Sequence, residues 1–288
     1  MRGYIWRAAL AISGAGVVAG CSTPPIHHVS SIPPGAQYVA MGSSFAAGPG
    51  VTTSADQPRT RCARSNDNFA HLVARRLDLK LTDVSCSGAT TEHVLGPWKE
   101  LPAQMDALTA DTRLVTITIG GNDVGYFNML WSASCAAEPA PARPGAPQCP
   151  LPPAGADAWQ KVETGMRRIA LEVHRRAPAA RLIFVDYLSA LPPEGTCATA
   201  PMTSGDARAI RSTARRLARL TARIAAETGS DVLKASSLSR LHNACSRDPW
   251  INGFRSPATT SGFVPYHPNK KGMAAIADFL LPYFGSIK

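Results

Sequence analysis

Residues 38–48 read Tyr-Val-Ala-Met-Gly-Ser-Ser-Phe-Ala-Ala-Gly and carry the strongest structural signal in the chain. An apolar run ends abruptly at a corner of small residues that contains a serine, which is typical of a buried strand that turns at the edge of a sheet. Ser44 would then stand at the end of the strand. A hydroxyl group is a poor nucleophile at neutral pH, so Ser44 also needs a base to take its proton and donors to hold the resulting oxyanion.

The groups that Ser44 needs are present further along the chain. A glycine lets a backbone N–H approach a ligand closely, an asparagine supplies a neutral amide donor, and a histidine can act as a general base. The blocks that supply them are Ser-Cys-Ser-Gly-Ala-Thr-Thr around Gly88, Gly-Gly-Asn-Asp around Asn122 and Val-Pro-Tyr-His-Pro around His267.

Ser44 and the three later blocks, taken in this order, resemble the four blocks of the SGNH, or GDSL-like, hydrolase family. The resemblance extends from Tyr38 to about Phe284, and the continuation Ala-Ala-Gly-Pro-Gly at 46–50 is similar to the secreted actinobacterial lipases and esterases of that family. The resemblance implies a three-layer α/β/α fold around a parallel, flavodoxin-like sheet of five strands.

The resemblance also implies a role for each block. Ser44 would attack the ester carbonyl while His267 acts as general base, and an acyl-serine intermediate would form. The oxyanion would be bound by the N–H groups of Ser44 and Gly88 and by the side-chain amide of Asn122. Neither a cofactor nor a metal ion is expected.

Two positions depart from the family pattern. Ser43 stands where the family usually has an aspartate that supports the turn, and we expect serine to be tolerated there. Val264 stands where the family usually has the aspartate that orients the histidine. Two ways of orienting His267 therefore remain open: the backbone carbonyl of Val264, as in relatives that use a Ser–His dyad, or the carboxylate of Asp248.

Five strand-like runs alternate with helical patterns along the chain, which predicts one parallel sheet covered by helices on both faces. The serine and asparagine blocks follow strands directly, at the ends where open α/β sheets bind ligands. The Pro/Ala/Cys-rich segment 132–155 is predicted to be a surface excursion and not part of the core. The five runs are residues 38–41, 79–84, 114–119, 182–185 and 231–234.

The N-terminus predicts export. Arg2 and Arg7 precede an apolar run that ends in Val-Ala-Gly-Cys, which looks like the cleavage and lipidation site of a bacterial lipoprotein. Cys21 would then carry lipid and hold the protein on the outer face of the cytoplasmic membrane, while plain secretion is the alternative. The predicted parts are a signal peptide at 1–20, a Pro-rich tether at 21–35 and one hydrolase domain at 36–288.

Six cysteines remain after Cys21. In an exported chain, an even number without close Cys-x-x-Cys spacing favours disulfides over a metal site. Six cysteines allow 15 pairings, and their spacing does not choose among them. The resemblance to the actinobacterial relatives implies that neighbours pair, as Cys62–Cys86, Cys135–Cys149 and Cys197–Cys245.

The chain is basic, with 30 Lys and Arg against 20 Asp and Glu and a formal net charge of +10. Nucleic acid is not expected as a partner, because no aromatic-interleaved basic motif is present and the protein is exported. Anionic lipid headgroups suit the charge better. Much of the positive charge falls in a stripe of arginines along a predicted helix at 206–227. This stripe is either a solvated face or a lipid-facing patch. The stripe consists of Arg211, Arg215, Arg219 and Arg223.

The leading functional hypothesis is a monomeric serine carboxylic-ester hydrolase that cleaves lipid-like or short-to-medium acyl esters. An acyltransferase acting on a cell-envelope sugar or lipid would use the same acyl-serine intermediate, so the motifs do not separate the two. A non-catalytic, surface-binding lipoprotein is a third hypothesis, since two family positions are altered.

Overall fold

The computed structural model describes residues 1, 3, 31–138, 149–255 and 263–284. The predicted lipidation site at Cys21 and nearly all of the predicted signal peptide lie outside these residues. None of the helices within the described ranges combines the length and the apolar character needed to cross a membrane.

Five parallel strands form one sheet in the order β2-β1-β3-β4-β5, which is the flavodoxin-like order. The predicted fold class is therefore confirmed, and no predicted strand boundary is wrong by more than two residues. The strand order reverses between β1 and β3, and ligands of open α/β sheets bind at such a switch point. The strands are β1 (Gln37–Gly42), β2 (Lys80–Asp83), β3 (Thr112–Thr118), β4 (Arg181–Val185) and β5 (Asp231–Leu233).

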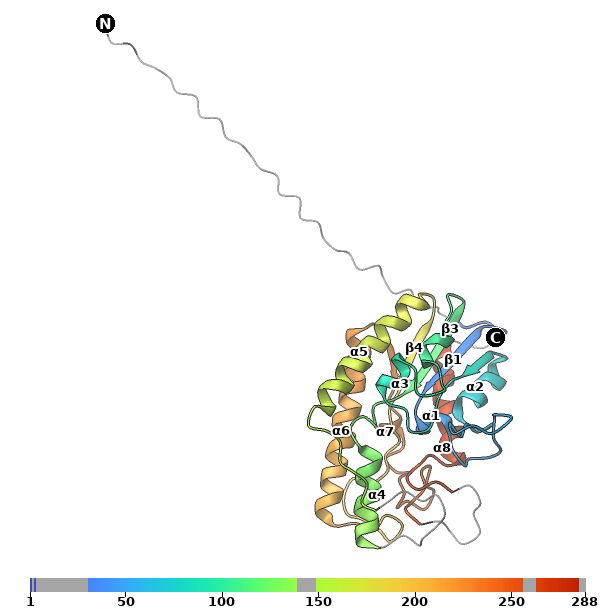
Figure 1. Cartoon of the computed structure of the whole chain (residues 1–288), viewed down its shortest axis with the longest axis vertical. Coiled ribbons are helices and arrows are strands. Elements are labelled where there is room, and N and C mark those ends of the chain that lie inside the picture. Colours follow the sequence, from blue (N-terminus) through green and yellow to red (C-terminus); the bar gives the residue numbers. More distant parts are fainter. Residues whose placement is uncertain (2, 4–30, 139–148, 256–262, 285–288) are drawn as a thin grey trace.

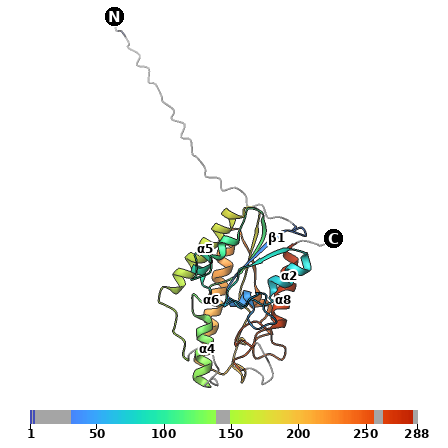
Figure 2. The same ribbon diagram turned by 45° about the vertical axis from the view of Figure 1, so that its right-hand side comes forward.

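Helices cover both faces of the sheet. α2 (Phe69–Leu77) and α8 (Lys270–Leu280) lie side by side on one face, while α5 (Ala158–Arg176) and α6 (Ser204–Glu227) cover the other (Figures 1 and 2). The shorter helices lie in the connections. They are α1 (Ser44–Ala47), α3 (Thr91–Leu95), α4 (Tyr126–Ala137) and α7 (Ala235–Leu238), with 3₁₀ turns η1 (Gln104–Ala107) and η2 (Leu281–Phe284).

The core forms because the central strands are apolar on both sides. All residues of β1 except Gln37 are buried, and β3 is buried from Leu114 onward, as a sheet between two helical layers requires. Tyr38 brings a polar group into this core, and its hydroxyl hydrogen-bonds to Thr116 Oγ1 at 2.7 Å. Burial there raises the pKa of the Tyr38 phenol far above its ordinary value.

The prediction of a surface excursion at 132–155 is wrong for its first part. α4 continues to Ala137, and Ser134 is completely buried with its hydroxyl bonded to that of Tyr266. The residues from Tyr126 to Ala137 are aromatic, apolar or small apart from Asn128, so the helix continues until the prolines begin. Residues 139–148 lie outside the described part of the chain.

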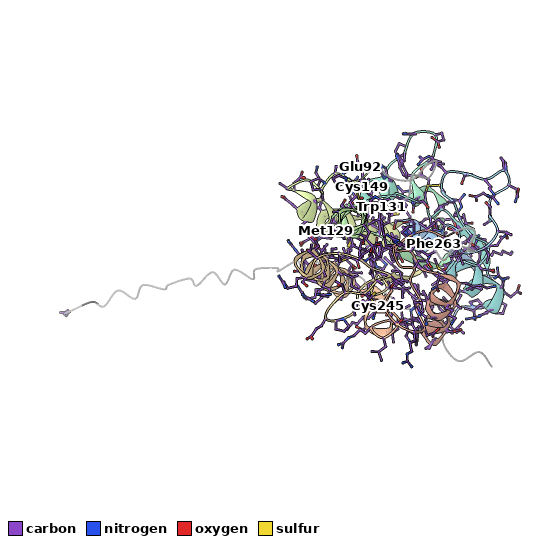
Figure 3. All side chains as sticks on the ribbon, turned by 90° about the horizontal axis from the view of Figure 1, so that it is seen from below. Glu92, Met129, Trp131, Cys149, Cys245 and Phe263 are labelled. Atoms are coloured by element: carbon purple, nitrogen blue, oxygen red, sulfur yellow. A yellow bond between two sulfur atoms is a disulfide. The ribbon has the colours of Figure 1, made fainter. Side chains whose placement is uncertain are left out.

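Three disulfides join the cysteines in the neighbouring pairs that the resemblance implies. In the view of Figure 3, Cys149 and Cys245, which belong to two different bridges, lie on opposite sides of the molecule. These two bridges therefore brace separate loops. The pairs are Cys62–Cys86, Cys135–Cys149 and Cys197–Cys245.

Candidate active site

The corner after β1 is held by a close backbone approach. Gly42 has φ +128°, and a Cβ at this position would overlap the backbone of Thr118 on β3. The N–H of Ser43 donates to the Thr118 carbonyl at 2.9 Å, after which the chain turns directly into α1. Ser44 is therefore the first residue of a helix, and N–H groups of a first turn have no partner within their helix.

Gln104, in the 3₁₀ turn η1, also holds this corner, a role that the sequence did not reveal. Its Oε1 accepts from the Gly42 N–H at 2.7 Å, and its Nε2 donates to the Gly42 carbonyl at 3.0 Å. The side chain is buried, so both ends of the amide are satisfied by one backbone residue. A glutamine within the mostly apolar run 101–108 is the one signal that could have identified it.

Ser44 and His267 meet although 223 residues separate them. The Ser44 Oγ and His267 Nε2 are 2.8 Å apart, and His267 Nδ1 lies 2.8 Å from the Pro265 carbonyl oxygen. A carbonyl oxygen can only accept, so Nδ1 must carry the proton and Nε2 is left to accept from the serine hydroxyl. This is the tautomer that a general base for Ser44 requires.

The expectation that the Val264 carbonyl orients the ring is wrong, since Pro265 supplies the carbonyl. The Val264 oxygen instead accepts from Asn252 Nδ2 at 2.9 Å. The reason is local: Tyr266 adopts φ +55°, which is rare for a residue with a side chain, and this left-handed turn presents the nearer carbonyl to the imidazole. Spacing in the sequence cannot reveal such a turn.

Asp248 does not orient His267 either. Its side chain is 52% exposed and forms an ion pair with Lys271, and its carboxylate lies 3.5 Å from His242 Nδ1. The Lys271 ammonium, the main cause, lowers the pKa of Asp248. The two ring nitrogens of His267 bind Pro265 and Ser44 instead, and no hydrogen bond within the described residues joins the ring to Asp248.

The His267 ring lies in an apolar environment. The rings of Phe45 and Phe127 approach it with centroid distances of 5.1 and 5.2 Å, and the residue is only 5% exposed. Burial disfavours the charged imidazolium and lowers the pKa of His267 to about 4, although the bond to the Pro265 carbonyl opposes the shift. The imidazole is therefore neutral at neutral pH and available as a base.

Hydrogen bonds join the glycine and asparagine blocks to the serine corner. Cys86 N donates to the Gly42 carbonyl at 3.0 Å, which brings the Gly88 loop to the end of β1. Asn122 Nδ2 donates to the Ala89 carbonyl at 2.9 Å, and Asp123 accepts from the backbone and hydroxyl of Thr91. Asp123 thus braces the loop.

Tyr187, also missed by the sequence analysis, connects the serine corner to the asparagine loop. Its hydroxyl accepts from the Gly121 N–H at 2.8 Å and lies 3.4 Å from Ser43 Oγ. The Tyr187 ring packs edge-on against Phe45 at 4.7 Å. Ser43 is buried and in contact with this phenol, so a serine at the position of the usual aspartate still has a polar partner.

Comparison with known proteins agrees with this geometry. Residues 40–275 match the GDSL-like Lipase/Acylhydrolase family. The chain belongs to this family. Lipase 2 of Streptomyces coelicolor is 31% identical over 88% of this chain and 87% of its own length. The chain is a serine ester hydrolase, in keeping with its family.

Solved structures show the same fold. Phospholipase A1 of Streptomyces albidoflavus has a TM-score of 0.70 and 23% identity, and an extracellular lipase of Streptomyces rimosus has a TM-score of 0.68 and 25% identity. Each comparison covers 86% of this chain and 99% of the other.

In this GDSL-like hydrolase, a stack of side chains supports Gly88. Gly88 has φ +86°, and a Cβ placed on it would lie 3.2 Å from the Trp98 ring. The Arg61 guanidinium lies 3.8 Å from the centre of the Trp98 ring, and His93 stacks on that ring with centroids 4.1 Å apart. The Trp98 ring is thus held between a cation and an imidazole, with one edge against Gly88.

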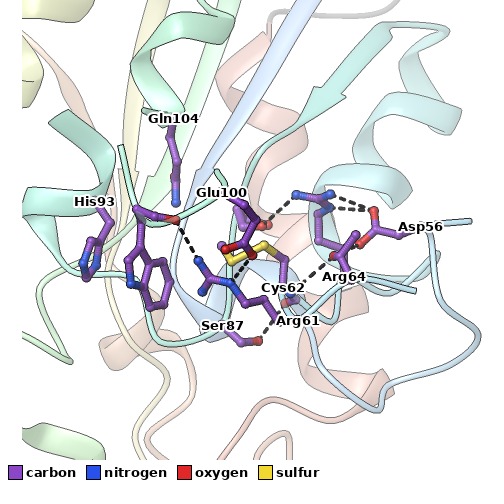
Figure 4. The surroundings of a disulfide bond; sticks show 12 residues. Asp56, Arg61, Cys62, Arg64, Ser87, His93, Glu100 and Gln104 are labelled. Atoms are coloured by element: carbon purple, nitrogen blue, oxygen red, sulfur yellow. Dashed lines mark hydrogen bonds and ion pairs between the residues drawn. A yellow bond between two sulfur atoms is a disulfide. The ribbon is translucent and has the colours of Figure 1, made fainter. Parts of the chain in front are cut away.

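The neighbouring bonds tie this stack to the disulfide Cys62–Cys86 (Figure 4). Arg61 donates to Glu100 at 2.7 Å and to the Trp98 carbonyl at 2.9 Å. Ser87, next to Gly88, donates its hydroxyl to the Cys62 carbonyl at 2.8 Å. The loop that carries the Gly88 N–H is therefore fixed both covalently and by packing.

We predict that Trp98→Ala lowers kcat about tenfold, since the Gly88 N–H would lose the ring that sets its position, and small displacements of an oxyanion donor weaken transition-state binding. Steady-state kinetics on a p-nitrophenyl ester measure this. Trp159→Ala is the matched control, because Trp159 also has an arginine, Arg216, 4.0 Å from the centre of its ring but lies on α5. Equal losses of kcat in both variants would contradict the role of Trp98.

Proposed function

We propose that this enzyme hydrolyses lipid-like or short-to-medium acyl esters through an acyl-Ser44 intermediate. The observation that carries the proposal is the 2.8 Å contact between Ser44 Oγ and the unprotonated Nε2 of a buried, neutral His267. A surface-binding protein without catalysis has no need of a nucleophile and base in this arrangement.

In the proposed mechanism, Ser44 Oγ attacks the ester carbonyl while His267 Nε2 takes the hydroxyl proton. The oxyanion is stabilised by the N–H groups of Ser44 and Gly88 and by the second N–H of the Asn122 amide, whose first N–H binds Ala89. The imidazolium returns its proton to the leaving alcohol, and water repeats the cycle on the acyl-enzyme. The Pro265 carbonyl holds the ring throughout and supplies only a partial charge.

Aromatic side chains next to His267 support an apolar acyl group. Phe127, which contacts the imidazole, stacks near Trp131 at 6.2 Å, and Trp131 packs edge-on against Phe254 at 5.3 Å. The similar proteins named lipase or phospholipase also favour a lipid-like ester. Product analysis with an added alcohol would reveal acyl transfer in place of hydrolysis.

The catalytic roles are tested by three substitutions. We expect Ser44→Ala to abolish ester hydrolysis and labelling by a fluorophosphonate, and His267→Ala to lower kcat by about 10³-fold or more. Asp248→Asn, the control, should stay near the wild-type rate because its carboxylate binds Lys271 at the surface. Turnover by Ser44→Ala, or a large loss in Asp248→Asn, would refute the assigned dyad.

The lowered pKa of His267 predicts that the enzyme stays active at an unusually acidic pH. The base must be unprotonated, and burial lowers its pKa from 6.5 to about 4, so kcat/KM should fall only as the pH drops well below 6.5. The pH dependence of kcat/KM on a neutral ester measures this, with circular dichroism to show that the fold persists. An acid limb at pH 6.5 or above in folded enzyme would show that the ring is solvated.

We further propose that the enzyme is exported and held by lipid on Cys21 at the outer face of the cytoplasmic membrane. Two or more acyl chains anchor a protein far more firmly than one. Cys21→Ala should then move the protein out of the detergent-extracted membrane fraction, as followed by fractionation and immunoblotting. Wild-type protein in the medium, with a mature N-terminus downstream of Cys21, would show plain secretion.

A further inference from the structure

A cavity of about 290 Å³ lies apart from Ser44 and His267. It is lined by α6, by residues 187–193 after β4, and by residues 236–240 in and after α7, and it is partly open to solvent; Tyr126 at the start of α4 completes the lining. Its volume is near the lower end of the range for small-molecule sites, about 300–1,000 Å³. A cavity of this size suits a single chain of medium length and not a two-chain lipid.

The walls of this cavity are mainly apolar. Leu188, Ile210 and Leu217 line it and are almost fully buried, as is Tyr126. Tyr187 and Ala190 also line it. An aliphatic chain placed here would replace water against apolar surface, which is favourable.

Three arginines line the same cavity: Arg211 and Arg215 on α6, and Arg240 after α7. Within the part of the chain that the structure describes, none of the three forms an ion pair. Arg223, further along α6, is neutralised by Glu163 and Glu227. The arginine stripe seen in the sequence is therefore compensated at one end of α6 and uncompensated beside the cavity.

Arg211 is already held in place. It donates to the Gly195 carbonyl at 2.9 Å and to the Pro192 carbonyl at 3.3 Å. Carbonyl groups fix the guanidinium but do not cancel its charge, and the planar group has five donors. Part of the cost of ordering an anion-binding arginine is thus met before a ligand arrives.

The nearby carboxylates do not neutralise the three arginines. Asp186 is buried behind Ser236 and accepts from its N–H and hydroxyl at 2.7 and 2.6 Å. Burial raises the pKa of Asp186 to about 6. Glu194 lines an adjoining hollow with Arg208, Arg211 and Arg215, and the balance of charge there remains positive.

We propose that this cavity binds a medium-chain carboxylate, with its chain against the apolar wall and its head between Arg211, Arg215 and Arg240. Guanidinium groups bind carboxylates through paired, charge-assisted hydrogen bonds, and an apolar pocket selects the acid that carries a chain. The site is separate from the hydrolytic centre. That such an acid is released by the enzyme's own reaction rests on the proposed function, whereas the binding itself does not.

Calorimetric titration of the full chain with decanoate tests the proposal. We expect one saturable site, with Kd raised at least about tenfold in Arg211→Gln/Arg215→Gln, because two charge-assisted contacts are lost. Arg216→Gln/Arg219→Gln is the matched control: it also removes two positive charges from α6, at positions that do not line the cavity. A Kd for this control within about twofold of wild type is expected, and equal weakening in both variants would overturn the site.

Other ligands test the contributions of the alkyl chain and of the anionic head separately. Acetate should bind far more weakly than decanoate, as should decyltrimethylammonium, because one lacks the chain and the other the anionic head. Comparable binding of either one would overturn the proposal, and tighter binding of decyl phosphate would assign the site to a phosphate head. No saturable binding of decanoate would also overturn it.

Two controls keep the two sites distinguishable. Protein whose active site has been blocked with a fluorophosphonate should bind decanoate as before, and loss of binding would place the ligand at Ser44. Arg211→Gln/Arg215→Gln should keep the wild-type rate of ester hydrolysis. Failure of decanoate binding with normal hydrolysis would refute this site alone, whereas loss of hydrolysis in Ser44→Ala concerns only the proposed function.

Discussion

The close approach of Gly42 on β1 to Thr118 on β3 is the constraint on which the site depends. No side chain fits at that point, so β1 can pair to its end and then turn at once into α1. The turn places Ser44 at the switch point of the sheet, and Gln104 satisfies both backbone groups of the corner. The loops that carry Gly88, Asn122 and His267 complete the site by reaching this same edge of the sheet.

The base is oriented without a carboxylate. The Pro265 carbonyl selects the tautomer of His267, and burial keeps the ring neutral until the pH falls to about 4. A carbonyl offers less stabilisation to the imidazolium than an aspartate does, since it carries only a partial charge. Stabilisation of the oxyanion by the donors around Ser44 thus becomes more important. The loop that carries the Gly88 N–H is accordingly held in place by a disulfide at Cys86 and by packing against Trp98.

The positive charges of α6 are paired with carboxylates at one end of the helix and, within the part of the chain that the structure describes, unpaired beside the cavity. Arg223 forms a network with two glutamates, whereas Arg211 and Arg215 face an apolar cavity with no carboxylate bound to them among the described residues. Tyr187 lines that cavity and also reaches the serine corner, where its hydroxyl contacts Gly121 and Ser43. One aromatic residue therefore borders both regions.

From the sequence alone, the apolar runs predicted all five strands, most clearly the central β1 and β3, which are buried on both faces, and the blocks around Ser44 and His267 located those two residues. The sequence did not determine the partners of those residues. Pro265 replaced Val264 because of a left-handed turn at Tyr266, and Gln104, Tyr187 and Trp98 act on backbone groups that are distant in sequence or belong to other loops. Local patterns record burial and periodicity, whereas contacts of this kind exist only once the tertiary structure has brought the loops together.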